Sequence, residues 1–285
     1  MRIGLLVGGL VIALIAGFAL GKATTTAGTG SPGAVTPTFN EASPHAHPAT
    51  GTTGGEIGGL AISASGYTLV PQQTAMKAGT QDFRFVITGP DRKPVTTFTV
   101  VHEKLLHLVV VRRDLSGYQH LHPTMAADGT WSVPVALAPG MWRAVADFTA
   151  TDAAGAQTAV ALGTDLSVAG AYQPAALPQA ARTATVGGHT VTFEGTPQIG
   201  ATSPILFRVL ANGTPATLQP YLGSYGHLVV FRDLDLAYVH THPDAQLANG
   251  GVKFWATAPS SGTYRMFFDF QVDGKVHTAT FTLVV

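Results

Sequence analysis

Apolar and polar residues alternate with the period of β-strands through much of the chain after residue 57. Between Tyr264 and Phe270, every second residue is aromatic or methionine. Side chains at i and i+2 face the same side of a strand, so this stretch predicts one buried face. Similar segments lie between turn signals such as Pro139-Gly140. No part of 57–285 keeps a helical period, so the pattern predicts an all-β protein.

The pattern also repeats. Six positions in the first half, from His107 to Pro123, recur 120 residues later without a gap, and they include Arg112, Tyr118 and two further histidines. Further on, Asp147 and Phe148 match Asp269 and Phe270. A period this long indicates two copies of a whole domain.

The repeat defines the expected organisation of the chain. Predicted strands in the first copy are 82–88, 95–101, 107–112, 131–137, 141–148 and 158–162. About seven short strands in each copy suggest two tandem immunoglobulin-like or cupredoxin-like sandwiches. We place domain one at 57–168, an Ala/Pro-rich linker at 169–183 and domain two at 184–285.

The N-terminus has a membrane signal. The uncharged run Ile3–Gly21 is about 28 Å long as a helix, close to the thickness of a bilayer core. We expect residues 1–22 to be a signal anchor, with a cleaved signal peptide as the alternative. Residues 23–56 are rich in Thr, Gly and Pro and predict a disordered tether. The expected location is therefore a single-pass membrane protein with extracytoplasmic domains, or a secreted protein if the signal is cleaved.

The composition excludes several kinds of binding site and of chemistry. The chain of 285 residues has 16 Lys+Arg against 16 Asp+Glu, and only 11% of its residues are charged. Such a balance gives no basic surface for nucleic acid. The absence of cysteine excludes disulfides, thiolate nucleophiles and blue-copper sites.

The 11 histidines carry the functional signal. The motif His-x-His-Pro occurs in the tether at His45 and His47, and once in each domain. In an extended chain the two imidazoles of the motif project to the same side, close enough to bind one ion. The following proline keeps the pair extended.

A third imidazole completes each predicted site. His107 begins a strand thirteen residues before His120, and a hairpin would bring it opposite the pair. The sequence thus predicts one three-histidine metal site in each domain. The ligand sets are His107, His120, His122 and His227, His240, His242. An ion shared between the domains, or between a domain and the tether, remains an open arrangement.

Several other residues are accessory candidates. They are His102 in domain one, His277 in domain two, the matched pair Asp147 and Asp269, and His45 and His47 of the tether. The two aspartates are expected either to accept the second N–H of a ligating imidazole or to pair with Arg112, Arg143, Arg232 or Arg265. Met125 lies just past the motif of domain one. We interpret His189 as a surface residue, and Tyr118 and Tyr238 as core residues.

Imidazole-only ligation favours Cu(II) or Zn(II), because soft ligands for Cu(I) are nearly absent. Binding requires neutral imidazole, so it should weaken below the ordinary histidine pKa of about 6.5.

The pattern His-Leu-x-Val-x-Arg, then Tyr-x-His-x-His-Pro, then Gly-x-Tyr/Trp-Arg and Asp-Phe, resembles exported, membrane-anchored bacterial proteins of the heavy-metal-associated or YtkA/FixH-like type. The resemblance covers roughly 102–148 and 222–280. It implies a small β-sandwich with a metal-binding or chaperone-like role in copper handling outside the cytoplasm.

These observations favour a membrane-tethered, non-enzymatic protein that buffers, delivers or senses Cu(II) or Zn(II). Its expected partners are the ion, the membrane and an exported metal-handling protein. One alternative is a metal-dependent extracytoplasmic enzyme with a water on the fourth coordination position. Another is an immunoglobulin-like surface interaction protein without metal.

Overall fold

The computed structural model describes residues 57–285. The predicted anchor 1–22 and tether 23–56 lie outside this part. Every regular element in residues 57–285 is a β-strand, which confirms the all-β class. Within the same range, no helix has the length and apolar character needed to cross a bilayer.

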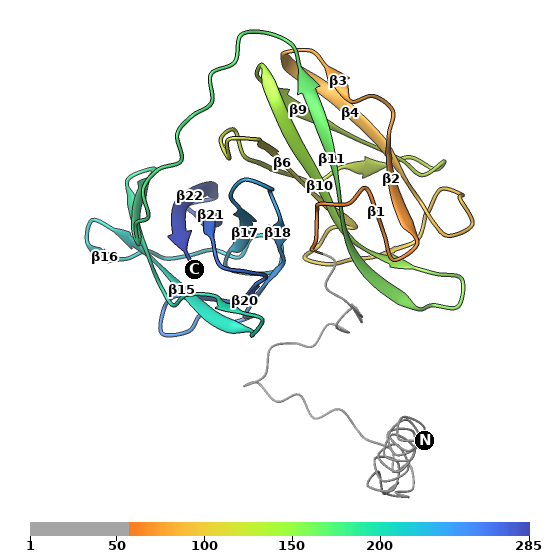
Figure 1. The fold of residues 1–285 in the computed structure, drawn as a ribbon. Helices are drawn as coiled ribbons and strands as arrows, with labels where there is room; N and C mark the ends of the chain where they lie inside the picture. Colours follow the sequence, from red (N-terminus) through yellow and green to blue (C-terminus); the bar gives the residue numbers. More distant parts are fainter. Residues whose placement is uncertain (1–56) are drawn as a thin grey trace, which may run out of the picture. The chain divides into compact units, whose positions relative to one another are not determined.

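The strands of residues 57–168 are β1 (Ser63–Ala64), β2 (Tyr67–Pro71), β3 (Ala75–Met76), β4 (Gly79–Thr88), β5 (Phe98–Thr99), β6 (Leu106–Arg112), β7 (Gln119–Leu121), β8 (Thr124–Met125), β9 (Thr130–Leu137), β10 (Gly140–Thr151) and β11 (Gln157–Val168). They form two sheets, with strand orders β1-β2-β4-β9-β8 and β3-β11-β10-β6-β7 (Figure 1). Buried residues of both sheets, such as Phe85, Trp131, Leu108 and Leu162, form one core. Two sheets that share a core in this way make a β-sandwich.

The strands of the second repeat begin at Thr183, one residue before the predicted boundary. They are β12 (Thr183–Val186), β13 (His189–Glu194), β14 (Gln198–Ile199), β15 (Ser203–Ala211), β16 (Thr214–Pro215), β17 (His227–Arg232), β18 (Tyr238–Val239), β19 (Thr241–Pro243), β20 (Val252–Ala258), β21 (Thr263–Val272) and β22 (Lys275–Val284). Their sheets have the orders β12-β13-β15-β20-β14 and β18-β17-β21-β22. The alternating residues predicted from Tyr264 to Phe270 are all buried in the second core. The burial follows the two-residue period of the strand.

One predicted strand is much shorter than expected. Of the segment 95–101, only Phe98–Thr99 pairs in a ladder, with β10. The backbone N–H of Val95 instead donates to Ile87 of the other sheet. The chain crosses from one sheet to the other within this segment, so it does not form one continuous strand.

Strands β6 and β17 are buried on both faces. Leu108 and Val110 face the core of domain one, whereas Val109 and Val111 belong to a third apolar cluster with Val229 and Phe231 of domain two. The ring of Tyr118 stacks on that of Phe267, with centroids 4.1 Å apart. This cluster packs the facing sheets of the two domains against each other.

Candidate metal site

The His-x-His motif of domain one lies at the hairpin of β6 and β7. Val109 lies opposite His120, and Leu108 lies opposite Leu121. One further step in this antiparallel register places His107 opposite His122. Since side chains alternate along a strand, the three histidines share the face of Val109, which packs against domain two.

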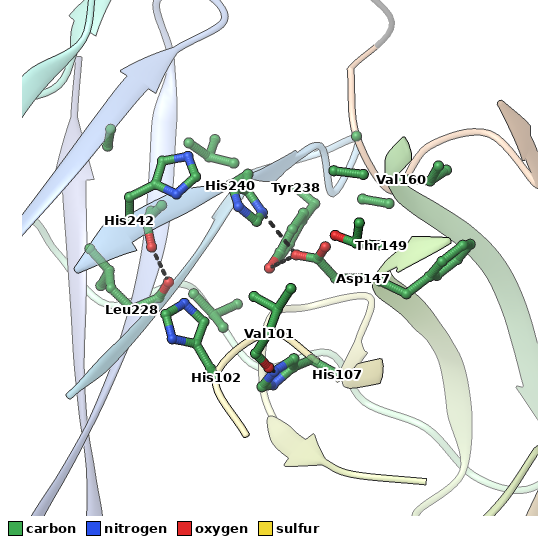
Figure 2. A pocket seen from close by; sticks show the side chains of 18 of the residues that line it. Val101, His102, His107, Asp147, Thr149, Val160, Leu228, Tyr238, His240 and His242 are labelled. Carbon is green, nitrogen blue, oxygen red and sulfur yellow. Dashed lines mark hydrogen bonds and ion pairs between the residues drawn. The ribbon is translucent and has the colours of Figure 1, made fainter. Parts of the chain in front are cut away.

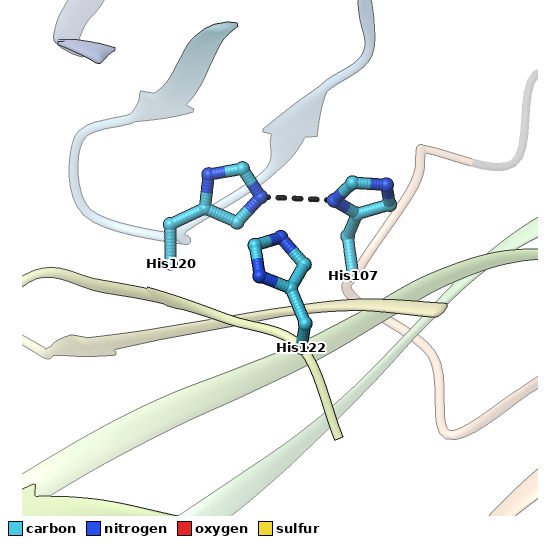
Figure 3. Close-up of side chains that lie close together, drawn as sticks. All are labelled: His107, His120 and His122. Carbon is cyan, nitrogen blue, oxygen red and sulfur yellow. Dashed lines mark hydrogen bonds between the residues drawn. The ribbon is translucent and has the colours of Figure 1, made fainter. Parts of the chain in front are cut away.

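The three imidazoles converge (Figure 3). One ligand atom from each of His107, His120 and His122 lies within 4.8 Å of the others. The ring centroids are 5.3 Å apart for His107 and His120, and 5.0 Å apart for each of the other two pairs. Imidazoles bound tetrahedrally at about 2.0–2.1 Å place their ring centroids about 5 Å apart, so this spacing fits one ion.

The outer nitrogens of two rings are held by hydrogen bonds. His107 Nε2 donates to the carbonyl of Val101 over 3.0 Å, and His120 Nδ1 donates to Asp269 Oδ2 over 3.0 Å. The inner nitrogens, His107 Nδ1 and His120 Nε2, are then 3.0 Å apart. With both rings neutral, two lone pairs face each other. Either a proton on His120, which would then donate to His107 and pair with Asp269, or a metal ion between the rings relieves the repulsion.

The third imidazole, His122, also has an inner nitrogen that requires a partner. His122 Nε2 is buried and has no hydrogen-bond partner. A buried nitrogen without a partner is costly, and coordination to an ion would satisfy it. The three nitrogens therefore suit a proton or a metal ion, and their spacing is that of a metal site.

Burial favours the neutral form of His107 and His122. It lowers the pKa of His107, and the nearby His120 lowers it further. Burial, together with His120 and His107, lowers the pKa of His122 to about 3. Neutral imidazole is the form that binds metal, so little proton release is needed at these two residues.

In domain two the expected grouping is not formed. The group of three or more metal-ligating side chains found within residues 57–285 is the one in domain one. His240 and His242 remain neighbours, with centroids 4.6 Å apart. The ring of His227 instead contacts His102, His107 and His120.

The path of the chain explains why the three histidines of domain two do not come together. In domain one the strand stays paired with β6 through Leu121, and it joins the opposite sheet from Thr124. In domain two the pairing with β17 ends at Val239, and Thr241 already pairs with β20 of the opposite sheet. The earlier crossing carries His242 away from His227.

The two matched aspartates act across the domain boundary. Asp269 Oδ2 accepts hydrogen bonds from His120 and from the hydroxyl of Tyr118, each 3.0 Å long. In the reciprocal set, Asp147 Oδ2 accepts from Tyr238 over 2.8 Å and from His240 over 2.9 Å (Figure 2). Each carboxylate therefore orients an imidazole of the other domain.

Among residues 57–285, neither of these aspartates pairs with one of the candidate arginines. Arg112, Arg143 and Arg232 pair with Asp114, Asp165 and Asp235, and Arg265 donates to Thr280 and Thr282. Tyr238 is a buried core residue, as the sequence suggests, whereas Tyr118 is half-buried and packs against the third apolar cluster. The hydroxyl groups of both also join the domains. That second role is not visible in the sequence.

A cavity of about 710 Å³ adjoins the site. Residues of both domains line it, among them His102, His107, His120 and His227. Figure 2 shows His240 and His242 at the same cavity. A cation between the three histidines would thus be accessible from this space.

The remaining candidates lie elsewhere. His277 is next to His189, with ring centroids 5.0 Å apart, and does not join the cluster. His189 is not a plain surface residue, because its ring packs on Phe270 and its Nδ1 is buried. Met125 packs against the core of domain one. His45 and His47 lie outside the described residues.

Sequence reasoning missed the domain interface. The interface could have been predicted from Leu108–Val111 and Leu228–Phe231, because these runs are continuously apolar and do not alternate with polar residues. Such a run indicates a strand buried on both faces.

The family model for a domain of unknown function, DUF8832, matches residues 62–162 and again 184–285. The chain belongs to this family. Each match falls on one of the two sandwiches, so the DUF8832 unit is a single domain and this chain contains two. A comparison with curated proteins finds no match.

Solved structures with some likeness to the tandem DUF8832 chain include two adhesins. The adhesin InvE of Yersinia pseudotuberculosis is 15% identical, with 81% of this chain and 61% of that one covered and a TM-score of 0.23. The Escherichia coli adhesin FdeC is 15% identical, with coverages of 79% and 65% and a TM-score of 0.25. A putative membrane anchored protein from Corynebacterium diphtheriae is 11% identical, with coverages of 78% and 59% and a TM-score of 0.23. This chain spans less than two thirds of the length of each.

Proposed function

We propose that this DUF8832 protein is a non-enzymatic, extracytoplasmic metal-binding protein that holds Cu(II) or Zn(II) with His107, His120 and His122. The observation that carries the proposal is the pair of inner nitrogens 3.0 Å apart, whose outer N–H groups are already engaged. Ligating histidines in metalloproteins are oriented in this way by carbonyl and carboxylate acceptors.

The spacing needs little change for binding. Two nitrogens bound to a tetrahedral ion lie about 3.3 Å apart, so entry of an ion would separate His107 Nδ1 from His120 Nε2 by a few tenths of an ångström. Three imidazoles leave a fourth position, and the adjoining cavity would supply water to it. Imidazole ligands without thiolate or thioether suit Cu(II) and Zn(II).

The proposal also includes the location of the protein at the membrane. The apolar run Ile3–Gly21 would anchor the chain, and the tether would hold two immunoglobulin-like or cupredoxin-like domains outside the membrane. Buffering, delivery or sensing of copper, which the resemblance to heavy-metal-associated and YtkA/FixH-like proteins implies, remains a prediction.

The test is a Zn(II) titration of the full chain in mild detergent, in competition with a chelating indicator. His45 and His47 are replaced by alanine throughout, because the tether pair is itself a candidate ligand. We expect H120A/H122A to weaken the tightest site by at least about a hundredfold. The pseudo-equivalent variant H240A/H242A should leave that affinity within about threefold.

The control separates this geometry from general histidine binding. Equal losses in the two double variants would overturn the assignment to domain one. If the parent chain binds no metal, the proposal fails and the non-enzymatic surface interaction protein becomes the better hypothesis. Turnover of hydrolase or oxidase test substrates by the loaded protein would favour the enzyme.

A further inference from the structure

The imidazole cluster continues beyond the three histidines. The ring of His227, from β17 of domain two, lies 5.9 Å from that of His120 and 6.4 Å from that of His107. The ring of His102, from domain one, lies 5.2 Å from His227 and 6.1 Å from His107. Five imidazoles from two domains thus gather at one place.

Within this cluster, His102 and His227 form a pair of their own. Their separation of 5.2 Å equals that of two imidazoles on one ion, about 5 Å. Their distances to the nearest rings of the other three are larger, at 5.9–6.4 Å. The cluster therefore divides into a group of three and a group of two.

His227 is prepared as a ligand in the same way as its repeat partner His107. Its Nε2 donates to the carbonyl of Tyr221 over 2.8 Å, as His107 Nε2 donates to Val101. The donor nitrogen is thereby fixed, and the lone pair of the neutral ring is on Nδ1. His227 is only 6% exposed, so its position is well defined by packing.

His102 lies in a two-residue turn that does not itself require histidine. Val101 and Lys104 bond each other's backbone, and His102 and Glu103 have φ values of 47° and 62°. Domain two closes the matching turn with Leu222 and Gly223, whose φ values are 54° and 74°. Because domain two carries leucine at the matching position, the turn conformation itself does not select histidine at 102.

We propose that His102 and His227 bind a second divalent ion beside the first, so that the two domains share a paired-ion site. This inference rests on the proposed function of the three-histidine group. Both residues line the cavity, and two imidazoles leave coordination positions for water or a small ligand from that space. The ligand class is again Cu(II) or Zn(II), held by imidazole alone.

Cu(II) tests the pairing, because two nearby copper ions couple their electron spins. The full chain carrying H45A/H47A is titrated with Cu(II) and examined by electron paramagnetic resonance. We expect two tight equivalents with a half-field signal and a dipolar-broadened spectrum. Separate H227A and H102A variants should each bind one equivalent that gives the full signal of an isolated ion. H102A changes a turn residue, so it keeps the test valid if H227A folds poorly.

Two matched controls locate the second ion. H277A, in the other histidine pair, and H240A/H242A should both retain two coupled equivalents. Loss of the second equivalent in either control, or its retention in both H102A and H227A, overturns the proposal.

Stoichiometry separates this inference from the proposed function. A single equivalent in the parent chain overturns the second site, whether or not H227A weakens it, and leaves the first site standing. Binding that is insensitive to H120A/H122A would refute the three-histidine site instead.

Discussion

Replacing Asp269 by asparagine should weaken metal binding from the opposite domain. Asp269 is 3% exposed and accepts hydrogen bonds from His120, Tyr118 and Thr278, the last over 2.6 Å. The substitution keeps the shape but removes the charge and one acceptor oxygen, so the donor nitrogen of His120 is no longer fixed. Removal of such an orienting group typically costs about 10–100-fold in metal affinity.

The structure supplies the control for this prediction. Asp147 makes the equivalent bonds to Tyr238 and His240, and His240 is not part of the three-histidine group. Both D269N and D147N should therefore lose about 1–3 kcal/mol of unfolding free energy, since each disturbs a buried acceptor. Only D269N should lose affinity beyond about threefold.

The assay is Zn(II) competition for affinity and urea denaturation of the metal-free chain for stability, on the same preparations. The H45A/H47A background is used again. Equal affinity for the two variants would refute the orienting role of Asp269. Equal affinity together with unchanged stability would also refute the interdomain hydrogen bonds.

Three further predictions concern pH and the interface. Because burial lowers the pKa of His107 and brings that of His122 to about 3, Zn(II) affinity should fall much less between pH 7 and pH 5 than it would for three ordinary imidazoles. Three ordinary imidazoles would lose about 10⁴-fold, so a titration in that range that approached this loss would contradict the buried geometry. Burial also lowers the pKa of His227 to about 3, whereas the unfolded chain takes up this proton near pH 6.5. The metal-free protein should therefore lose stability as the pH falls from about 6.5 toward 3, with a slope approaching 1.4 kcal/mol per pH unit from this residue, and H227Q should flatten urea midpoints measured across the range. Finally, Phe267 is 2% exposed in the interdomain cluster, so F267A should cost about 3–5 kcal/mol in urea denaturation, and a cost below about 1 kcal/mol would show that the domains do not pack as described.

The sequence by itself determined the local features. The alternation from Tyr264 to Phe270 defined a strand and its buried face, because side-chain direction follows a two-residue period. The spacing of His120 and His122 made them neighbours on one face for the same reason. The distance from His107 to His120 suited a hairpin, and β6 and β7 form one.

Only the tertiary structure decided which distant residues meet. The strand after Tyr238 changes sheets at Thr241, so the same histidine spacing gives a three-imidazole group in one domain and not in the other. Asp269 reaches His120 across the domain boundary, because the outer faces of β6 and β17 pack together. Sequence periodicity describes the direction of a side chain along its own strand. The point at which a strand changes sheets, and the surface that its second face covers, depend on the packing of the whole chain.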